Sequence, residues 1–268
     1  MKTWIAFILL FVGLSAQART LLVSDVDDTI KLAHIKDLSE AARYAFDSRS
    51  RFAGMSELYH LIAKDQPDLE IVYLSRAPDW FMGRTHRKFL ENGNFPDGEY
   101  INRTNYDSDV HKIYTLREVM AKVRPDKVIF VGDNGEQDPE IYKQISEEFA
   151  GRGVEFHQFI RVVYPKTSIL LVLPEMMLEG QTGFVTPVEV ALDLEKAGIL
   201  KSSSVQNLIK TVLPKILDEP SYTAEGEVAF PYFVNCRDMV WKWDAAIPRF
   251  DGVKSVKDRI VNRCKLRP

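Results

Sequence analysis

The chain has 268 residues, of which 46% are hydrophobic, and its formal net charge is -3. This length and hydrophobic content allow one or two domains with a full core, which excludes a disordered or fibrous protein. The mildly acidic balance supplies no general basic field, so we expect no nucleic-acid partner.

The first residues have the layout of a secretory signal. Lys2 precedes an apolar run from Trp4 to Leu14, and Ala16-Gln17-Ala18 places small residues where a signal peptidase cuts. The run is shorter than the roughly 20 residues needed to cross a bilayer, and no later stretch is long and apolar enough to span one. We therefore expect residues 1–18 to be removed. The protein is expected to be exported, either to a periplasm or by secretion, with no integral membrane segment after cleavage.

Apolar runs and helical spacing alternate from residue 20 to residue 163. Short apolar runs bounded by turn residues predict strands at residues 20–26, 69–74, 127–131 and 154–163. Helical spacing predicts helices at residues 36–47, 55–64, 79–90, 109–123 and 139–149. This alternation predicts an α/β fold, a Rossmann-like parallel sheet with helices on both faces. Such sheets bind ligands beyond the carboxyl ends of their strands.

The pattern changes after Pro165. Thr186-Pro187-Val188-Glu189 combines a cap, a first-turn proline and a reciprocal Glu ahead of a helix that closes at Gly198. Ser204 and Ser255 are plausible starts of two more helices. We expect residues 19–165 to form the α/β domain and residues 166–268 to form a mainly helical C-terminal extension.

The chain has two cysteines, Cys236 and Cys264. In an exported protein, two cysteines are expected to form one disulfide, and two separate buried thiols are the alternative. The pair lacks the further cysteines or grouped histidines that a zinc site requires.

Polar residues follow three of the predicted strands at their carboxyl ends. In chain order they are Asp25, Asp27, Thr29, Ser75, Asp133 and Asp138. Lys112 lies in the first turn of the helix that precedes the third strand. Like charges about 4 Å apart cost a few kcal/mol even at an effective dielectric constant near 20. Carboxylates that converge on one edge of the sheet repel one another, so we expect a bound cation to compensate their charge.

Oxygen ligands with no histidine nearby in sequence favour Mg²⁺ over zinc. The five histidines never pair at i and i+4, which also argues against an imidazole metal site. Asp25 and Asp133 are expected to bind the ion directly, and Asp27 through its backbone carbonyl. Asp138 is expected to bind directly or through water, with capping of the next helix as an equal alternative because Pro139 follows. Mg²⁺ bridges to phosphates, so we expect a phosphorylated substrate.

Two carboxylates at alternate positions suit a covalent transfer in two steps. Asp25 is expected to attack phosphorus and form an aspartyl phosphate. Asp27 is expected to protonate the leaving alkoxide and then to take a proton from water. Thr29, Ser75 and Lys112 form the expected phosphate-binding set. Lys122 and Lys127 are poorer candidates for the lysine.

These residues resemble the four motifs of the haloacid dehalogenase superfamily: an Asp-x-Asp-x-Thr strand end, a Ser or Thr strand end, a Lys and an acidic strand end. The strings SDVDDTIK, YLSRAP, DVHKIYTLREV and VGDNGEQDPEIY are more narrowly similar to the catalytic domain of the fungal actin-patch-associated phosphatidate phosphatase family. The resemblance spans roughly residues 20 to 163. It implies a Rossmann-like core, Mg²⁺ dependence and hydrolysis of a phosphomonoester. The substrate that the family resemblance suggests is phosphatidate. Arg76-Ala77 departs from the Asn-Ser that often follows the serine, at a loop that touches the phosphate region.

The room for a cap domain is small. The first insertion point offers only about residues 31–53, and the second leaves little beyond a helix, a turn and a short strand. A small or absent cap implies an open site, compatible with a lipid headgroup or a phosphoprotein.

Other readings of the same residues stay open. A phosphotransferase on the same scaffold and a catalytically idle phosphate-binding module are the alternatives, and Asp27 argues against the idle module. Trp241, Trp243 and Phe250 are interpreted as core residues rather than as a membrane contact.

Overall fold

The computed structural model describes residues 18–104, 108–165, 167–168, 171–172, 177–218 and 226–265. The expected signal peptide lies outside these residues except for Ala18. None of the helices that they form combines the length and the apolar composition that crossing a membrane requires.

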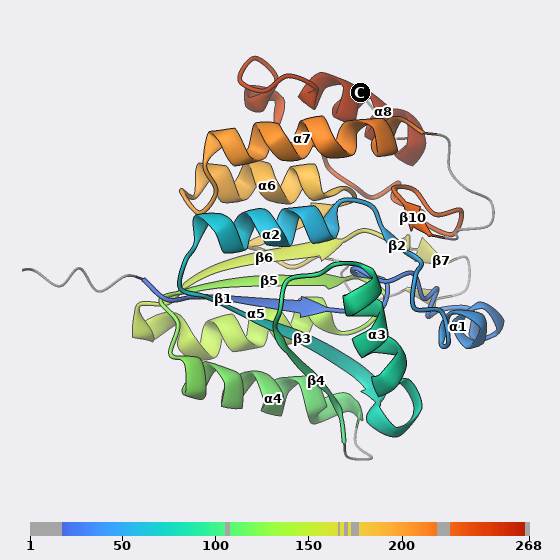
Figure 1. Cartoon of the computed structure of the whole chain (residues 1–268), viewed down its shortest axis with the longest axis vertical. Coiled ribbons are helices and arrows are strands. Elements are labelled where there is room, and N and C mark those ends of the chain that lie inside the picture. Colours follow the sequence, from blue (N-terminus) through green and yellow to red (C-terminus); the bar gives the residue numbers. More distant parts are fainter. Residues whose placement is uncertain are drawn as a thin grey trace, which may run out of the picture.

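Six parallel strands form the central sheet, in the spatial order β4-β3-β1-β5-β6-β9 (Figure 1). They are β1 (Thr20–Asp25), β3 (Leu69–Pro78), β4 (Glu99–Arg103), β5 (Lys127–Asp133), β6 (Glu155–Arg161) and β9 (Gln181–Phe184). Every residue of the central strand β1 is buried. Burial on both faces explains why the inner strands are apolar runs rather than alternating patterns. The predicted α/β fold with a parallel sheet is confirmed.

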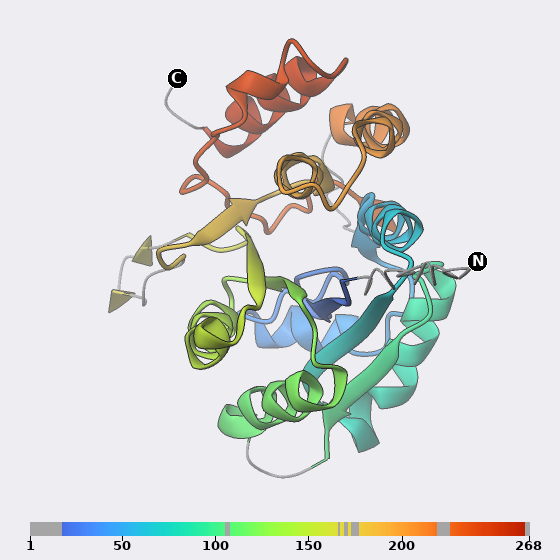
Figure 2. The ribbon, with the colours of Figure 1, turned by 90° about the vertical axis from the view of Figure 1, so that its left-hand side faces the viewer.

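Helices cover both faces of this sheet. On one face lie α4 (Ser108–Val123) and α5 (Asp138–Phe149), which bury Leu116, Met120 and Ile145 against the strands. The other face carries α2 (Met55–Asp65) and α6 (Pro187–Lys196). Outside them are stacked α7 (Ser202–Leu217) and α8 (Val253–Cys264), as Figure 2 shows from the side. The π-helical turn η1 (Asp79–Gly83) leads from β3 into α3 (Arg84–Asn92), whose Phe89 is buried in the same hydrophobic core as α2 and α6.

Short elements complete the chain. Near the carboxyl edge of the sheet, α1 (Leu38–Tyr44) begins after Asp37, whose carboxylate accepts hydrogen bonds from the backbone amides of Ser39 and Glu40. The remaining strands are β2 (Arg51–Phe52), β7 (Thr167–Ser168), β8 (Leu171–Val172) and β10 (Glu227–Val228). Two 3₁₀ turns are η2 (Ala150–Arg152) and η3 (Asp244–Ala246). Only α1 and β2 occupy the first insertion point, so the cap there is as small as predicted.

The C-terminal part of the chain is mainly helical, as predicted, but it is built into the sheet. Strand β9 pairs with β6, so the central sheet runs across the expected boundary at residue 165. Strand β10 pairs with β2 in a separate two-stranded sheet, which also joins the two parts of the chain. The capping box at Thr186 and Glu189 forms. The expected starts of the next helices are wrong by two residues, since α7 begins at Ser202 and α8 begins after Gly252, whose φ of 92° suits glycine.

A buried arginine joins this C-terminal part to the loop after β1. The guanidinium of Arg161 donates hydrogen bonds to the carbonyls of Thr29, at 2.8 Å, and of Val185. It also lies between the rings of Phe52 and Phe184, 4.1 and 4.5 Å from their centroids. Burial lowers the pKa of Arg161 to about 10. The extension is therefore packed against the same loop that carries the first motif.

Cys236 and Cys264 form a disulfide that ties the end of α8 to the segment before it. Both cysteines are buried, and so are the nearby Trp243 and Phe250. Those two aromatic residues are core residues, as predicted, whereas Trp241 is partly buried against the core.

Candidate active site

The carboxyl ends of β1 and β3 border a cavity of about 380 Å³. Asp25 is the last residue of β1, and Asp27 and Ser75 line the cavity beside it. The parallel register pairs Asp25 with Leu74, which brings Ser75 to the same edge. Three larger hollows, of about 590, 750 and 610 Å³, lie elsewhere on the described part of the chain and contain none of the predicted site residues.

Three carboxylates form a buried cluster next to this cavity. Asp25, Asp133 and Asp138 each place one carboxylate oxygen within 4.8 Å of the other two. Their exposed fractions are 4%, 1% and 0%. Burial raises the pKa of Asp25 well above its ordinary value against the opposing charge of Lys112, and the charge of Asp138 adds to the rise. Burial and the charge of Asp25 likewise raise the pKa of Asp133. Closely spaced oxygen donors that repel one another fit a hard divalent cation.

Lys112 is the protein's own cation in this cluster. Its Nζ donates hydrogen bonds to Oδ1 of Asp25 and Oδ1 of Asp138, both at 2.6 Å. Burial lowers the pKa of Lys112, but the charges of Asp138 and Asp25 outweigh burial and raise it, so the ammonium stays protonated. The two poorer candidates lie elsewhere: Lys122 pairs with Glu99 and Lys127 lies near Glu155.

Thr29 and Asp138 lie beside the cluster and support the carboxylate of Asp133 or its backbone. Thr29 is fully buried, and its hydroxyl donates a 3.2 Å hydrogen bond to Oδ2 of Asp133. Asp138 is not a helix cap, because the N-cap of α5 is Gln137. Its Oδ2 instead accepts a 3.4 Å hydrogen bond from the backbone amide of Asp133.

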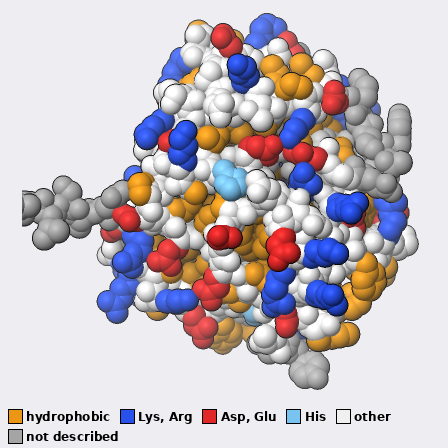
Figure 3. All heavy atoms as spheres, in the orientation of Figure 1, with side chains coloured by type: hydrophobic (Ala, Val, Ile, Leu, Met, Phe, Trp, Pro, Cys, Tyr) orange, Lys and Arg blue, Asp and Glu red, His pale blue; other side chains and the backbone are white. Residues whose placement is uncertain are grey.

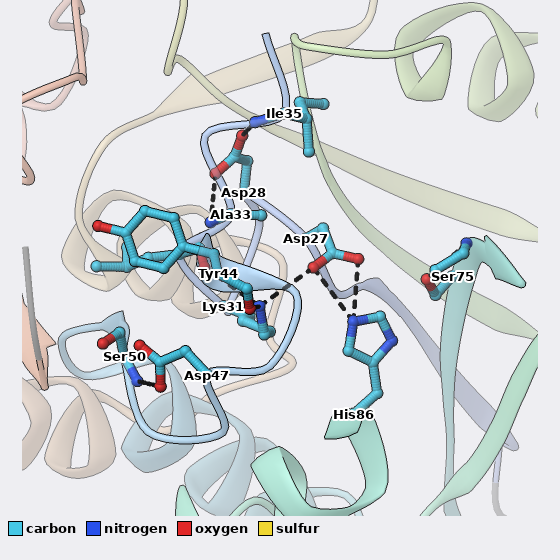
Figure 4. A network of polar contacts seen from close by, with 12 residues as sticks. Asp27, Asp28, Lys31, Ala33, Ile35, Tyr44, Asp47, Ser50, Ser75 and His86 are labelled. Atoms are coloured by element: carbon cyan, nitrogen blue, oxygen red, sulfur yellow. Dashed lines mark hydrogen bonds and ion pairs between the residues drawn. The ribbon is translucent and has the colours of Figure 1, made fainter. Parts of the chain in front are cut away.

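Asp27 lies on the cavity wall with partners of its own (Figure 4). Nε2 of His86 lies 3.2 Å from the Asp27 carboxylate, and Nζ of Lys31 lies 3.6 Å from it. Burial raises the pKa of Asp27, but the charge and hydrogen bond of His86, together with Lys31, outweigh burial and hold the pKa well below its ordinary value. Nδ1 of His86 is in turn 2.8 Å from the hydroxyl of Tyr100.

His86 and Lys31 are the site residues that sequence reasoning missed. Both are fully buried, although lysine is mostly exposed in proteins and histidine is intermediate. The signal in the sequence was indirect: His86 precedes Phe89 by one helical turn, which puts both on the buried face of α3. Nothing in the sequence pairs His86 with Asp27, which belongs to a different element.

Asp28 fixes the loop that carries these residues. It adopts a left-handed φ of 58°. Its carboxylate accepts hydrogen bonds from the backbone amides of Ala33, His34 and Ile35 and from the hydroxyl of Tyr164. The side chain of Asp28 points away from that of Asp27 (Figure 4). These hydrogen bonds hold the segment from Asp28 to Ile35 in a closed loop, and Asp27, which precedes this loop, lies at the cavity.

The cavity has both polar and apolar lining. Arg76 and Glu136 line it and form an ion pair of 3.6 Å. The apolar part of the lining, here called the apolar wall, consists of Ala33, Ile35, Ala41, Ala45, Ala77, Pro78, Phe81 and Met82. The cavity can thus hold an anionic group near the carboxylate cluster and its cation, together with an apolar group.

About half of the chain is similar to a curated protein. A curated relative, "Uncharacterized protein C29B5.04c" of Schizosaccharomyces pombe, is 24% identical over 144 residues, which are 49% of this chain and 23% of the relative. The chain thus spans about a quarter of the length of that relative.

Solved structures give distant likenesses. The haloacid dehalogenase (HAD) domain of the effector protein Lem4 from Legionella pneumophila, solved as an inactive mutant, is 18% identical with a TM-score of 0.37, over 52% of this chain and 84% of that one. The Pnkp1/Rnl/Hen1 complex contains a chain that is 11% identical with a TM-score of 0.34, over 54% of this chain and 47% of that one. Likenesses at these TM-scores do not bear on the assignment.

The family comparison is decisive because of its extent. Residues 20–161, more than half of the chain, match the family described as "Phosphatidate phosphatase APP1, catalytic domain". The matched range contains all of the residues of the carboxylate cluster, and the expected resemblance is confirmed. The chain belongs to the family of the phosphatidate phosphatase APP1 catalytic domain.

Proposed function

We propose that this phosphatase hydrolyses phosphomonoesters with the help of Mg²⁺ and through an aspartyl phosphate formed on Asp25. One observation carries the proposal. Asp25 ends the central strand at the cavity, is held by Lys112 at 2.6 Å, and has Asp27 beside it on the same cavity wall. A nucleophile, a cation and a second carboxylate with separate partners thus meet at one place.

The cation would be held by the carboxylates of Asp25, Asp133 and Asp138, whose oxygens lie within 4.8 Å of one another. The backbone carbonyl of Asp27 is the further ligand proposed from the sequence. Bound Mg²⁺ would offset the negative charge of the carboxylates and of the phosphate, so that an anionic nucleophile and an anionic substrate can meet.

Asp25 is the proposed nucleophile. Its carboxylate forms a bond to phosphorus while the bond from phosphorus to the leaving alkoxide breaks. Lys112 fixes the orientation of that carboxylate through Oδ1 and adds positive charge next to the transferred group. Water then attacks phosphorus, releases phosphate and restores Asp25.

Asp27 is the proposed general acid and base. It protonates the alkoxide in the first step and accepts a proton from the attacking water in the second. His86 and Lys31 hold its carboxylate in place and keep its pKa below the ordinary value. An anionic phosphate in the cavity favours the protonated form of a neighbouring carboxyl. Substrate binding therefore shifts Asp27 toward the acid that the first step needs.

A lipid phosphate of the phosphatidate kind is the proposed substrate. The family to which the chain belongs is described by that activity, and the apolar wall of the cavity suits an acyl-bearing phosphomonoester. Export is the proposed destination, and it is supported by the disulfide between Cys236 and Cys264, since disulfides persist in oxidising compartments.

The test is turnover of p-nitrophenyl phosphate and of phosphatidate in detergent micelles, with Mg²⁺ and with EDTA. We expect activity that needs Mg²⁺ and is abolished by Asp25→Asn. Asp258→Asn is the matched control, because Asp258 is exposed and pairs only with Lys254 among the contacts described. Activity that survives Asp25→Asn would refute the proposed nucleophile, and full activity in EDTA would refute the role of the metal.

A further inference from the structure

Large aromatic side chains are exposed at the mouth of the cavity. Phe46 is 70% exposed, Trp80 86% and Phe81 43%. The Phe81 ring centroid lies 5.6 Å from that of Phe46 and 5.6 Å from that of Trp80, so the three rings form one group, here called the aromatic rim. Hydrophobic side chains gather over α1 and η1 at the lower right of the space-filling view (Figure 3).

The aromatic rim continues the apolar wall of the cavity. Phe81 belongs to both, because it lines the cavity and contacts the two more exposed rings. Phe46 follows α1, whereas Trp80 and Phe81 belong to η1, so segments from two insertion points meet at the rim. A molecule that enters with its phosphate toward Asp25 would meet this rim with its opposite end.

The fold itself gives no reason for this exposure. Full burial of a large hydrophobic side chain stabilises a protein by about 1.5–3 kcal/mol, and here most of that stabilisation is forgone. Exposed hydrophobic groups of this kind mark contacts with other molecules. Tryptophan with neighbouring phenylalanine is typical of surfaces that enter the boundary region of a lipid bilayer.

The charge next to the rim also fits a lipid surface. Between residues 79 and 88, Arg84, Arg87 and Lys88 stand against one acid, Asp79, which gives a formal charge of +2 with His86 neutral. The three basic residues are exposed on α3, and Lys and Arg side chains lie beside the hydrophobic group in Figure 3. Each basic residue near an anionic bilayer contributes about 1 kcal/mol of attraction.

A protein partner fits the rim less well. A specific protein interface covers about 800 Å² on each side, with a shaped apolar centre. The rim offers three protruding rings at the edge of a cavity, which is enough for insertion into a lipid surface but small for a protein interface.

We propose that the aromatic rim inserts into the surface of a lipid bilayer and thereby turns the mouth of the cavity toward the lipid headgroups. The inference rests on the proposed function in one respect: the group that enters the cavity is then a lipid phosphate drawn from that bilayer.

The test measures binding apart from turnover. Full-length protein is sedimented with vesicles of phosphatidylcholine alone and of phosphatidylcholine with phosphatidylserine, neither of which carries a phosphomonoester. Trp80→Ser and Phe46→Ser are expected to lower the partition coefficient by about tenfold each. Val240→Ser is the matched control, because Val240 is 68% exposed but lies away from the rim, and it should leave binding unchanged. Phosphatidylserine should strengthen the binding of every variant.

A second readout locates the inserted residue. Brominated phosphatidylcholine should quench the tryptophan emission of the wild-type protein, and this quenching should be lost in Trp80→Phe although the protein still binds. Unchanged vesicle binding in Trp80→Ser with Phe46→Ser would overturn the proposal. So would a dimer in ultracentrifugation that Trp80→Ser dissociates while vesicles do not bind, because the rim would then join two copies.

Failure of the proposed function would look different. Neither Trp80 nor Phe46 lines the cavity, so both variants should keep the wild-type rate with soluble p-nitrophenyl phosphate. A protein that binds vesicles through the aromatic rim but has no phosphatase activity would refute the proposed function. The proposal that the aromatic rim inserts into a bilayer would still hold. An active phosphatase whose vesicle binding is unchanged by Trp80→Ser and Phe46→Ser would refute only the proposal that the aromatic rim inserts into a bilayer.

Discussion

Replacing Lys112 with Met removes the lysine that donates hydrogen bonds to two members of the carboxylate cluster. Nζ of Lys112 lies 2.6 Å from Asp25 and 2.6 Å from Asp138, and all three side chains are buried. At an effective dielectric constant near 20, each contact corresponds to an attraction of about 6 kcal/mol. Burying the ammonium costs several kcal/mol, so the net effect is smaller. Removal of one member of a buried ion pair typically destabilises a protein by about 3–5 kcal/mol.

We therefore expect Lys112→Met to lower the free energy of unfolding by about 3–5 kcal/mol at neutral pH in EDTA. Mg²⁺ should recover part of this loss, because a divalent cation compensates the same carboxylates. At a concentration of 100 times its dissociation constant, the ion contributes about 2.7 kcal/mol. The variant should gain more from Mg²⁺ than the wild-type protein does, since its cluster carries one more uncompensated negative charge.

Urea denaturation with and without Mg²⁺ measures both effects. Lys122→Met is the matched control on the same helix, because Lys122 is 65% exposed and its pair with Glu99 is screened by solvent. If Lys112→Met in EDTA lost no more than this control, the cluster would not depend on the lysine. If Mg²⁺ stabilised both proteins equally, the ion and Lys112 would not share the same carboxylates.

Three further predictions follow from the partners of Asp27, the disulfide and the raised pKa values. His86→Gln should lower kcat/KM at least about tenfold more for an alkyl phosphate than for p-nitrophenyl phosphate, because only the poorer leaving group needs the proton from Asp27; equal losses would assign His86 a structural role alone. Replacing both cysteines by Ser should cost about 3.5 kcal/mol in urea denaturation, given the 28-residue separation of the pair, and a loss below about 1 kcal/mol would contradict this. In EDTA, the folded protein binds more protons than the unfolded chain because the pKa values of Asp25 and Asp133 are raised above 3.8. The free energy of unfolding should therefore fall as pH rises from about 4 through the raised values, and Mg²⁺ should flatten the fall; stability that rises over this range in EDTA would contradict the raised values.

The parallel sheet could be predicted because its inner strands carry their own signal. Residues 69–74 and 127–131 are short apolar runs, which are typical of strands buried on both faces of a sheet. The segments between these runs have the spacing of amphipathic helices. The outer strand β9 was not predicted, since Gln181–Phe184 is four residues long and contains a glycine. Its place beside β6 depends on long-range pairing that no local pattern records.

The site could be predicted to the extent that it follows from strand ends. Asp25, Ser75 and Asp133 were expected at one edge because parallel strands end together there, and the structure brings them to that edge. The contacts that Thr29 and Asp138 make with Asp133 could not be predicted, because they depend on how the loop after β1 closes and where α5 begins. His86 and Lys31 could not be assigned, because their contacts with Asp27 arise only when α3 packs against that loop.

Trapping the phosphorylated enzyme tests the central claim most directly. The protein is mixed with phosphatidate and Mg²⁺, quenched in acid within one turnover and digested, and the phosphorylated peptide is sequenced by mass spectrometry. The proposed mechanism predicts an acid-stable, hydroxylamine-sensitive phosphate on Asp25, and none in EDTA or in Asp25→Asn. Phosphate released at the full rate with no label on Asp25, or a label on Ser75 instead, would contradict it.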